Sequence, residues 1–261
     1  MATIVVGGKV ARGEHRFYFI LALIMAFVLV AGFSVQLAAG RSSFSAPWFV
    51  HLHGVTFFGW TFYYVLQTGL AANGSLGLHR RLGWAGAVWA VALVVIGIAT
   101  TVVMVRRGAA PFFFTPLGFL LMNSLSVLSF AGLIAASIAL RRRTEWHRRL
   151  ITCGMALLTG PGWGRLLPMP FLIPWADWAV FGAIMIVPLV GVIADLRRSG
   201  HVHPAWWIGI AVMANAQVSI GLVGHSAIGQ SLYRAVTAGS PGATIAPLDY
   251  PPSPMIAAPV G

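Results

Sequence analysis

The chain has 261 residues, of which only 8% are charged, whereas charged residues make up roughly a quarter of a soluble domain. Hydrophobic residues account for 58% and the mean hydropathy is +0.84, so a water-soluble domain would lack the polar residues needed to cover its surface. An ordinary soluble globule is therefore excluded. The net charge of +12 does not point to nucleic acid, because the basic residues lie between apolar runs and do not form one exposed face.

Seven apolar runs are long enough to cross a bilayer at about 20 residues per span. They cover residues 17–39, 48–71, 84–105, 117–140, 149–167, 176–196 and 205–227. The fifth run is the weakest, because Gly160, Pro161 and Gly162 are expected to break or bend it. We predict an all-α, polytopic transmembrane helix bundle of about seven spans that forms one domain over residues 1–238.

Basic residues are unevenly distributed between alternate loops. One side of the membrane would carry Lys9, Arg12, Arg16, Arg80, Arg81, Arg141, Arg142, Arg143, Arg148, Arg149, Arg197 and Arg198, and the other Arg41, Arg106, Arg107, Arg165 and Arg234. The positive-inside rule then predicts a cytoplasmic N-terminus and an external C-terminus. Frequent Arg, Ala, Gly and Val are typical of GC-rich bacterial genomes, so we expect the bacterial inner (cytoplasmic) membrane.

The composition of the two ends of the chain predicts how each of them is organised. The first run could instead be a signal peptide, because Leu37, Ala38 and Ala39 loosely resemble a cleavage site, but about 23 residues is long for such a segment. A transmembrane span is therefore favoured. Residues 239–261 are rich in proline among small residues and are predicted to form a disordered or extended external tail.

Histidine is the residue type that says most about function. His53 and His225 lie near the outer ends of the second and seventh runs, and His79 and His147 at the cytoplasmic mouths of the third and fifth. Imidazoles on different helices can hold a haem iron, or a copper, zinc or iron ion. We predict all four as cofactor-binding residues, and His51, His53 and His225 as candidate ligands of a metal ion. The alternative for each is an interfacial histidine bonded to backbone, water or lipid headgroups.

Helical spacing separates the two histidines of the second run. His51 and His53 would lie about 200° apart on the helix and cannot face the same neighbour. Because polar groups turn inward in a membrane bundle, His53 is predicted to face the interior and His51 the periphery. The stripe through His53 continues with Phe57, Trp60, Tyr64 and Gln67.

Other polar residues at membrane depth have structural or transport interpretations. Asn123 and Asn215 fall near mid-span, where an unpaired amide is costly, so they are expected to bond across helices or to line a small cavity. Asp177 is expected to form an ion pair with Arg165. A retinal Schiff base is excluded, because the only lysine is Lys9, outside the apolar runs.

A short motif occurs twice. The sequence His-Arg-Arg-Leu occupies 79–82 and again 147–150, at the beginning of the third and fifth runs. This repetition predicts two copies of a helix hairpin, made of runs two and three and of runs four and five. The alternative is that arginine-rich cytoplasmic loops simply recur in membrane proteins.

These motifs support a resemblance over residues 48–167. With His53 on a helix and His-Arg-x-x-Gly at 79–83, the sequence resembles bacterial multi-pass membrane proteins of unknown function, and it is loosely similar to transmembrane b-type cytochromes. The resemblance implies binding of haem b and electron transfer, or a role in haem or oxidase assembly, with His53, His79 and His147 at matching positions. The run 117–140 has no histidine, so His225 would have to replace the missing outer ligand.

The leading hypothesis is therefore an inner-membrane protein that binds haem or a metal ion, with a quinone or another membrane redox protein as possible partner. Cationic residues near the membrane ends would pair with haem propionates: Arg80, Arg81, Arg148, Arg149 and Arg165. A small-solute transporter would instead have a water-lined cavity around Asn123 and Asn215. A non-catalytic subunit of a membrane complex would have a broad apolar face, and the sequence leaves enzymatic activity open.

Overall fold

Helices make up nearly all of the regular structure. The structure, a computed structural model, describes residues 2–42 and 44–252, and no strand occurs among them. The helices are α1 (Ala2–Ala38), α2 (Trp48–Ala72), α3 (Leu76–Arg106), α4 (Pro116–Ala139), α5 (Thr144–Leu157), α6 (Gly160–Leu166), α7 (Ala176–Ser199), α8 (Pro204–Gly224) and α9 (Ala227–Thr237), with 3-10 turns η1 (Met169–Leu172) and η2 (Pro241–Thr244). The predicted all-α fold is confirmed.

Among the described residues, five helices are both long and apolar enough to cross a membrane. They are α1 from Gly13 onward, α3, α4, α7 and α8. α2 has 25 residues and is not among these five helices; it contains two histidines and Gln67. α5 and α6, with 14 and 7 residues, are each too short to span. The composition and helices together define a multi-pass membrane helix bundle.

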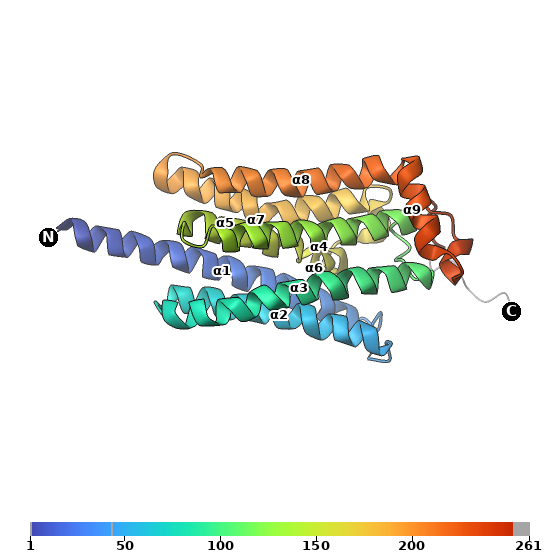
Figure 1. Cartoon of the computed structure of the whole chain (residues 1–261), viewed down its shortest axis with the longest axis horizontal. Coiled ribbons are helices and arrows are strands. Elements are labelled where there is room, and N and C mark those ends of the chain that lie inside the picture. Colours follow the sequence, from blue (N-terminus) through green and yellow to red (C-terminus); the bar gives the residue numbers. More distant parts are fainter. Residues whose placement is uncertain (1, 43, 253–261) are drawn as a thin grey trace.

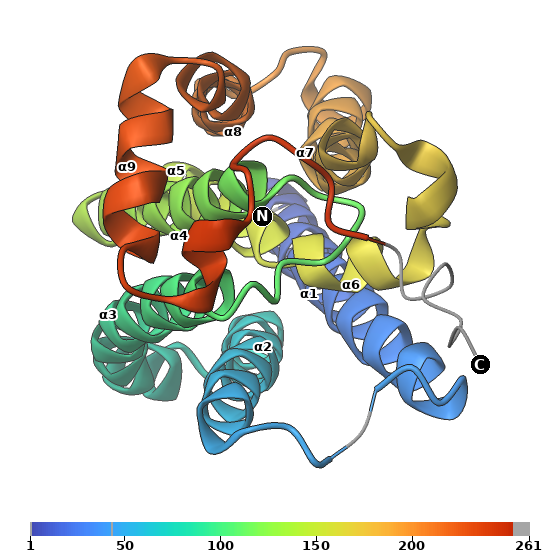
Figure 2. The ribbon, with the colours of Figure 1, turned by 90° about the vertical axis from the view of Figure 1, so that its right-hand side faces the viewer.

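The long helices lie side by side, and the chain crosses the bundle in alternate directions, with α5 and α6 together making the crossing between α4 and α7 (Figure 1). The turns α2–α3, α4–α5 and α7–α8 gather at one end, here called the N-terminal end. α9 lies across the opposite, C-terminal end (Figure 1). Viewed from the C-terminal end, α2 and α8 lie on opposite sides of the bundle, with α4 and α5 between them (Figure 2).

The fifth predicted run is broken, as its glycines and prolines indicated. α5 ends at Leu157 and α6 begins at Gly160. The break allows α6 to lie directly against α1, because a Cβ atom on Gly32 would be only 2.5 Å from the backbone oxygen of Gly162. A side chain at either glycine would force the two backbones apart.

Two helix ends differ from the prediction. α1 begins at Ala2, well before the expected start near residue 17. The seventh run was expected to continue to residue 227, but α8 ends at Gly224 and His225 is its C-cap. Ser226 then starts α9, and its hydroxyl accepts a hydrogen bond from the Gly229 N–H at 3.1 Å.

Residues 239–252 of the predicted tail contain the 3-10 turn η2 and contact the C-terminal end of the bundle. The Tyr233 hydroxyl donates to the Gly242 carbonyl at 3.0 Å, and the Leu117 N–H donates to the Pro247 carbonyl at 3.0 Å. Gly242 is buried so closely against α3 that a Cβ atom would meet the Val105 oxygen at 2.1 Å. Proline-rich composition favours an extended backbone but does not prevent it from packing on a preformed surface. Residues 253–261 lie outside the described residues.

Candidate functional site

The two faces of α2 are as predicted. On the face of His51, Val55 is 73% exposed and Phe62 56% exposed. On the face of His53, Trp60 and Tyr64 are each 3% exposed and Gln67 is 7% exposed. His51 itself is exposed, with its Nε2 3.1 Å from the Phe44 carbonyl, whereas His53 is half-buried and stacks on Phe57. The helical period alone was sufficient to separate these faces.

The structure brings the inner pair of histidines together. His79, in the first turn of α3, and His147, in the first turn of α5, are half-buried at the N-terminal end of the bundle. Their ring centroids are 6.3 Å apart and the rings are inclined at 78°, so they meet edge to face. The two motifs that look alike in sequence are therefore neighbours in space.

Both imidazoles have a defined proton position. His79 Nδ1 lies 3.2 Å from the Gln67 carbonyl, and His147 Nδ1 lies 3.0 Å from the Ser137 carbonyl. A carbonyl oxygen can only accept a hydrogen bond, so Nδ1 is the donor in each ring. A neutral imidazole of this kind keeps its lone pair on Nε2. In a metal-ligating histidine, the ring nitrogen that does not bind the metal usually donates its N–H to a group such as a backbone carbonyl.

The two histidines also have equivalent structural settings. His79 bonds to a carbonyl near the end of α2, the helix before its own, and His147 does the same with α4. The bonded residues are separated by 12 and 10 positions in the chain. The two bonds are of the same kind but differ by two positions in register, and the duplicated hairpin remains a prediction.

The structure does not bring the outer pair together. His53 is on α2 and His225 is the C-cap of α8, and these helices lie on opposite sides of the bundle (Figure 2). His225 is exposed, with Nδ1 2.9 Å from the Gly221 carbonyl of its own helix. His51 is likewise exposed, and within 2–42 and 44–252 no group of three His, Cys, Asp or Glu side chains is placed to hold a metal ion. The set His51, His53 and His225 is therefore not assembled.

A cluster of charged residues adjoins His147. Arg149, which is 4% exposed, forms a two-pronged ion pair with Asp195 of α7, with Nη2 2.7 Å from Oδ1. Arg148 pairs with Glu145 and, at 2.7 Å, with Glu14 of α1. This cluster was not predicted from the sequence, and both arginines were instead expected to pair with haem propionates. The sequence feature that could have predicted the ion pair is Asp195. It is an acidic residue at the end of an apolar run, and an acid there needs a basic partner such as those of the arginine-rich loop.

Two further residues support the site. The Ser137 hydroxyl lies 2.8 Å from His147 Nδ1 and donates to the His147 carbonyl at 3.1 Å. Ser137 is fully buried. His203, which precedes α8, packs its ring edge against Trp146 and accepts the Ala205 N–H at 3.1 Å. Burial and then the charge of Arg149 lower the pKa of His203 from its ordinary value.

The predicted ion pair between Asp177 and Arg165 is not formed. Asp177 accepts a hydrogen bond from the Gln217 amide at 3.1 Å. Arg165 donates to the Pro161 carbonyl at 2.9 Å and lies over the Phe33 ring, 3.8 Å from its centroid. The Arg165 guanidinium therefore contacts α1 and its own helix.

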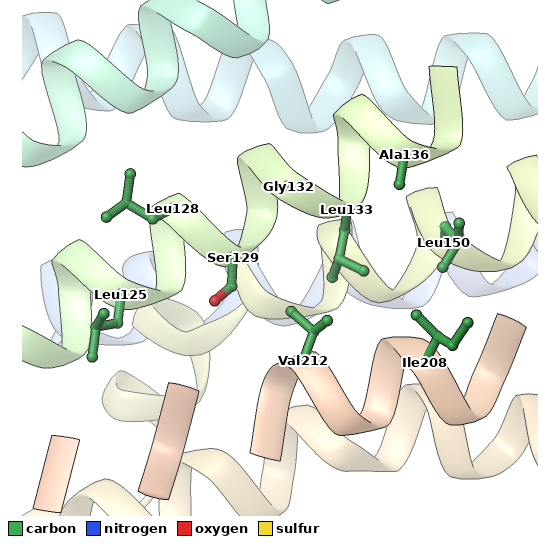
Figure 3. Close-up of a pocket in the computed structure, with 9 residues that line it drawn as sticks. All are labelled: Leu125, Leu128, Ser129, Gly132, Leu133, Ala136, Leu150, Ile208 and Val212. Atoms are coloured by element: carbon green, nitrogen blue, oxygen red, sulfur yellow. The ribbon is translucent and has the colours of Figure 1, made fainter. Parts of the chain in front are cut away.

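The mid-span amides do not line a polar cavity in the described part of the chain. The Asn123 amide donates at 2.8 Å to the Phe119 carbonyl of its own helix, and Asn215 is exposed on α8. A groove of about 440 Å³ runs between α4 and α8 (Figure 3). Its walls are Leu125, Leu128, Ser129, Gly132, Leu133, Ala136, Leu150, Ile208 and Val212. Neither asparagine is among them, so the feature expected of a transporter is not seen at these residues.

Comparisons with protein-family models, with curated proteins and with solved structures find no match to this chain.

Proposed function

We propose that the protein is an integral membrane protein that binds haem b through His79 and His147 and takes part in membrane electron transfer. The observation that supports this proposal is the pair of adjacent imidazoles, each with Nδ1 bonded to a backbone carbonyl. Both Nε2 lone pairs are then available to a metal. Two imidazoles from separate helices are a common ligand set for an electron-transfer haem in a membrane bundle.

The number of donors favours haem over a bare metal ion. Structural zinc takes four protein ligands and catalytic zinc three. No group of three suitable side chains is found in the parts of the chain that the structure describes, 2–42 and 44–252. A haem iron needs at most two axial protein ligands, because the porphyrin supplies the other four. His79 and His147 match that requirement.

The surrounding charges are also compatible with haem. Arg80 and Arg81, next to His79, are exposed and available to the propionates, whereas Arg148 and Arg149 already pair with carboxylates. The bound iron would supply one-electron redox chemistry. His79 and His147, whose ring centroids are 6.3 Å apart, would hold the iron. A membrane quinone or another membrane redox protein would be the electron partner.

We further propose seven crossings of the bacterial inner membrane, with the N-terminus in the cytoplasm and the C-terminus outside. α2 and the α5–α6 pair run alongside the five apolar helices (Figure 1), which supports two additional crossings. The arginines of the α2–α3, α4–α5 and α7–α8 regions lie at the N-terminal end. This excess of positive charge supports a cytoplasmic location for that end.

The visible spectrum of the purified full-length protein tests the proposal. Protein from haem-replete cells should show a Soret band and, after reduction with dithionite, the sharper α and β bands of a b-type cytochrome. The pyridine haemochromogen assay should give one haem per chain. The proposal is wrong if such protein has no Soret band, and iron, copper or zinc found by elemental analysis without that band would indicate a bare metal ion in place of haem.

A further inference from the structure

The hydroxyl of Tyr63, on α2, reaches the backbone of the neighbouring helix α3. It donates a hydrogen bond to the Leu82 carbonyl at 2.5 Å. The same oxygen accepts a hydrogen bond from the Gly86 N–H at 3.1 Å. Leu82 and Gly86 are four residues apart, so these are the carbonyl and the N–H that a regular α-helix pairs with each other. The Tyr63 hydroxyl therefore bridges one turn of α3.

The absence of a side chain at Gly86 makes this approach possible. A Cβ atom there would lie 2.8 Å from Tyr63 Cε1 and 2.9 Å from the hydroxyl oxygen, whereas a Cβ atom on Gly83 would meet nothing within 4 Å. A second bond runs between the same helices in the opposite direction, because the Trp89 Nε1 donates to the Thr56 carbonyl at 3.2 Å. Side chains from each helix thus bond to the backbone of the other.

Tyr63 is also connected to the histidine pair through Gln67. The Gln67 amide donates to the Tyr63 hydroxyl oxygen at 2.8 Å, and the Gln67 backbone carbonyl is the partner of His79 Nδ1. The single hydroxyl proton of Tyr63 is used on Leu82, so its oxygen can only accept from Gln67. The Gln67 Oε1 is buried without a hydrogen-bond partner in the described structure. The bond to Tyr63 is therefore the one that orients this side chain.

We propose that Tyr63 is a positioning residue for His79. The bond between His79 and the Gln67 carbonyl joins α3 to α2, so it persists only while the two helices keep their relative position. Tyr63 holds that position, because it bonds to Gln67 and to the turn of α3 that follows His79. In the proposed function, on which this role rests, His79 is an iron ligand, and the group bonded to Nδ1 sets the direction of Nε2.

Hydrogen exchange at the histidine Nδ1–H groups tests this role. The full-length protein, labelled with nitrogen-15 at histidine, is measured by NMR in dithionite, which keeps any bound haem diamagnetic. Tyr63→Phe keeps the ring and removes only the hydroxyl. It should accelerate exchange of the His79 Nδ1–H about fivefold or more, the usual effect of losing one hydrogen bond. Exchange at His147 should not change, because that ring has Ser137 as its own partner.

A second variant reaches the same contact from the other helix. Gly86→Ala places a methyl group against the Tyr63 hydroxyl and should also accelerate exchange at His79, which keeps the role testable if Tyr63→Phe folds poorly. Gly83→Ala, with open space around it, is its matched control. Tyr233→Phe is the control for Tyr63→Phe, because it removes a buried bond from a tyrosine hydroxyl to a carbonyl at the C-terminal end. Both controls should exchange like the wild type.

Two outcomes would overturn the proposal. One is unchanged exchange at His79 in both Tyr63→Phe and Gly86→Ala. The other is equal acceleration at His79 and His147, which would show general loosening of the bundle. The exchange measurement does not require bound haem, so accelerated exchange at His79 in a protein without a Soret band would contradict the proposed function and leave the role of Tyr63 supported.

Discussion

The Ser137 hydroxyl lies 2.8 Å from His147 Nδ1, and the same nitrogen lies 3.0 Å from the Ser137 carbonyl. Two oxygen atoms of Ser137, its hydroxyl and its carbonyl, therefore lie beside the Nδ1 proton of His147. His79 has a single carbonyl partner in the described structure. An acceptor at Nδ1–H makes the ring a stronger donor to a metal at Nε2. This asymmetry predicts that Ser137 tunes the site.

Replacement of Ser137 by Ala should raise the midpoint potential of the bound haem. The change removes the hydroxyl but keeps the carbonyl, so His147 donates less electron density and the oxidised iron loses stabilisation. A hydrogen bond contributes about 1 kcal/mol, which corresponds to a few tens of millivolts for a one-electron couple, at 59 mV per tenfold change. Spectroelectrochemical titration measures this change in midpoint potential. Ser129→Ala, on the same helix, is the control, and an equal potential in both variants would exclude this role for Ser137.

The buried pair of Arg149 and Asp195 should be essential for stability. Asp195→Asn leaves the Arg149 guanidinium buried without its countercharge, and breaking such a pair typically costs about 3–5 kcal/mol. Cys153 is the only cysteine and is fully buried, so reaction with a thiol-reactive dye during heating reports unfolding. We expect a large decrease in the unfolding temperature. Asp249→Asn, at an exposed acid, should leave it nearly unchanged, and similar curves for the two variants would show that the pair is dispensable.

The contact between α1 and α6 should tolerate no side chain at Gly162. A Cβ atom there would lie 2.9 Å from the Val28 oxygen, whereas a Cβ atom on Gly164 meets nothing within 4 Å. Gly162→Ala should therefore destabilise the bundle by about 1–3 kcal/mol, the usual effect of overpacking. The Cys153 assay measures this change, with Gly164→Ala as control. If Gly162→Ala is as stable as Gly164→Ala, the helices are not in backbone contact.

Stability should decrease as the solution becomes acidic, in part through His203. Burial lowers the pKa of His203 below its ordinary value of 6.5, and its ring accepts the Ala205 N–H. The folded state therefore favours the neutral ring, and this contribution is complete above the unfolded pKa and is lost as the pH falls below it. His203→Asn keeps an N-cap acceptor but cannot titrate. Its unfolding temperature should fall less than that of the wild type between about pH 7 and pH 5, and parallel curves would contradict this role.

Local patterns in the sequence predicted local structure well. The period of 3.6 residues assigned His53 and His51 to different faces of α2, because helical geometry alone decides that question. Gly160 and Pro161 marked the break between α5 and α6. The repeated His-Arg-Arg-Leu motif identified the two histidines that the structure places in contact.

Relationships between distant segments could not be predicted in the same way. Sequence does not say which helices are neighbours, so His53 and His225 were paired although α2 and α8 lie on opposite sides of the bundle. His225 also lies one residue beyond α8, and helix ends are the least predictable part of a helix. The role of Ser137 depends on the α4–α5 turn, which brings it to His147 from ten positions away.

The most direct test of the proposed haem site compares single histidine variants by their reduced-minus-oxidised visible spectra. Protein with His79→Phe or His147→Phe should lose most of the Soret band, while His225→Phe, at an exposed residue held by its own helix, should keep it. Thermal unfolding monitored at Cys153 confirms that each variant is folded. A Soret band that survives in both His79→Phe and His147→Phe, or that disappears only in His225→Phe, would contradict haem binding between α3 and α5.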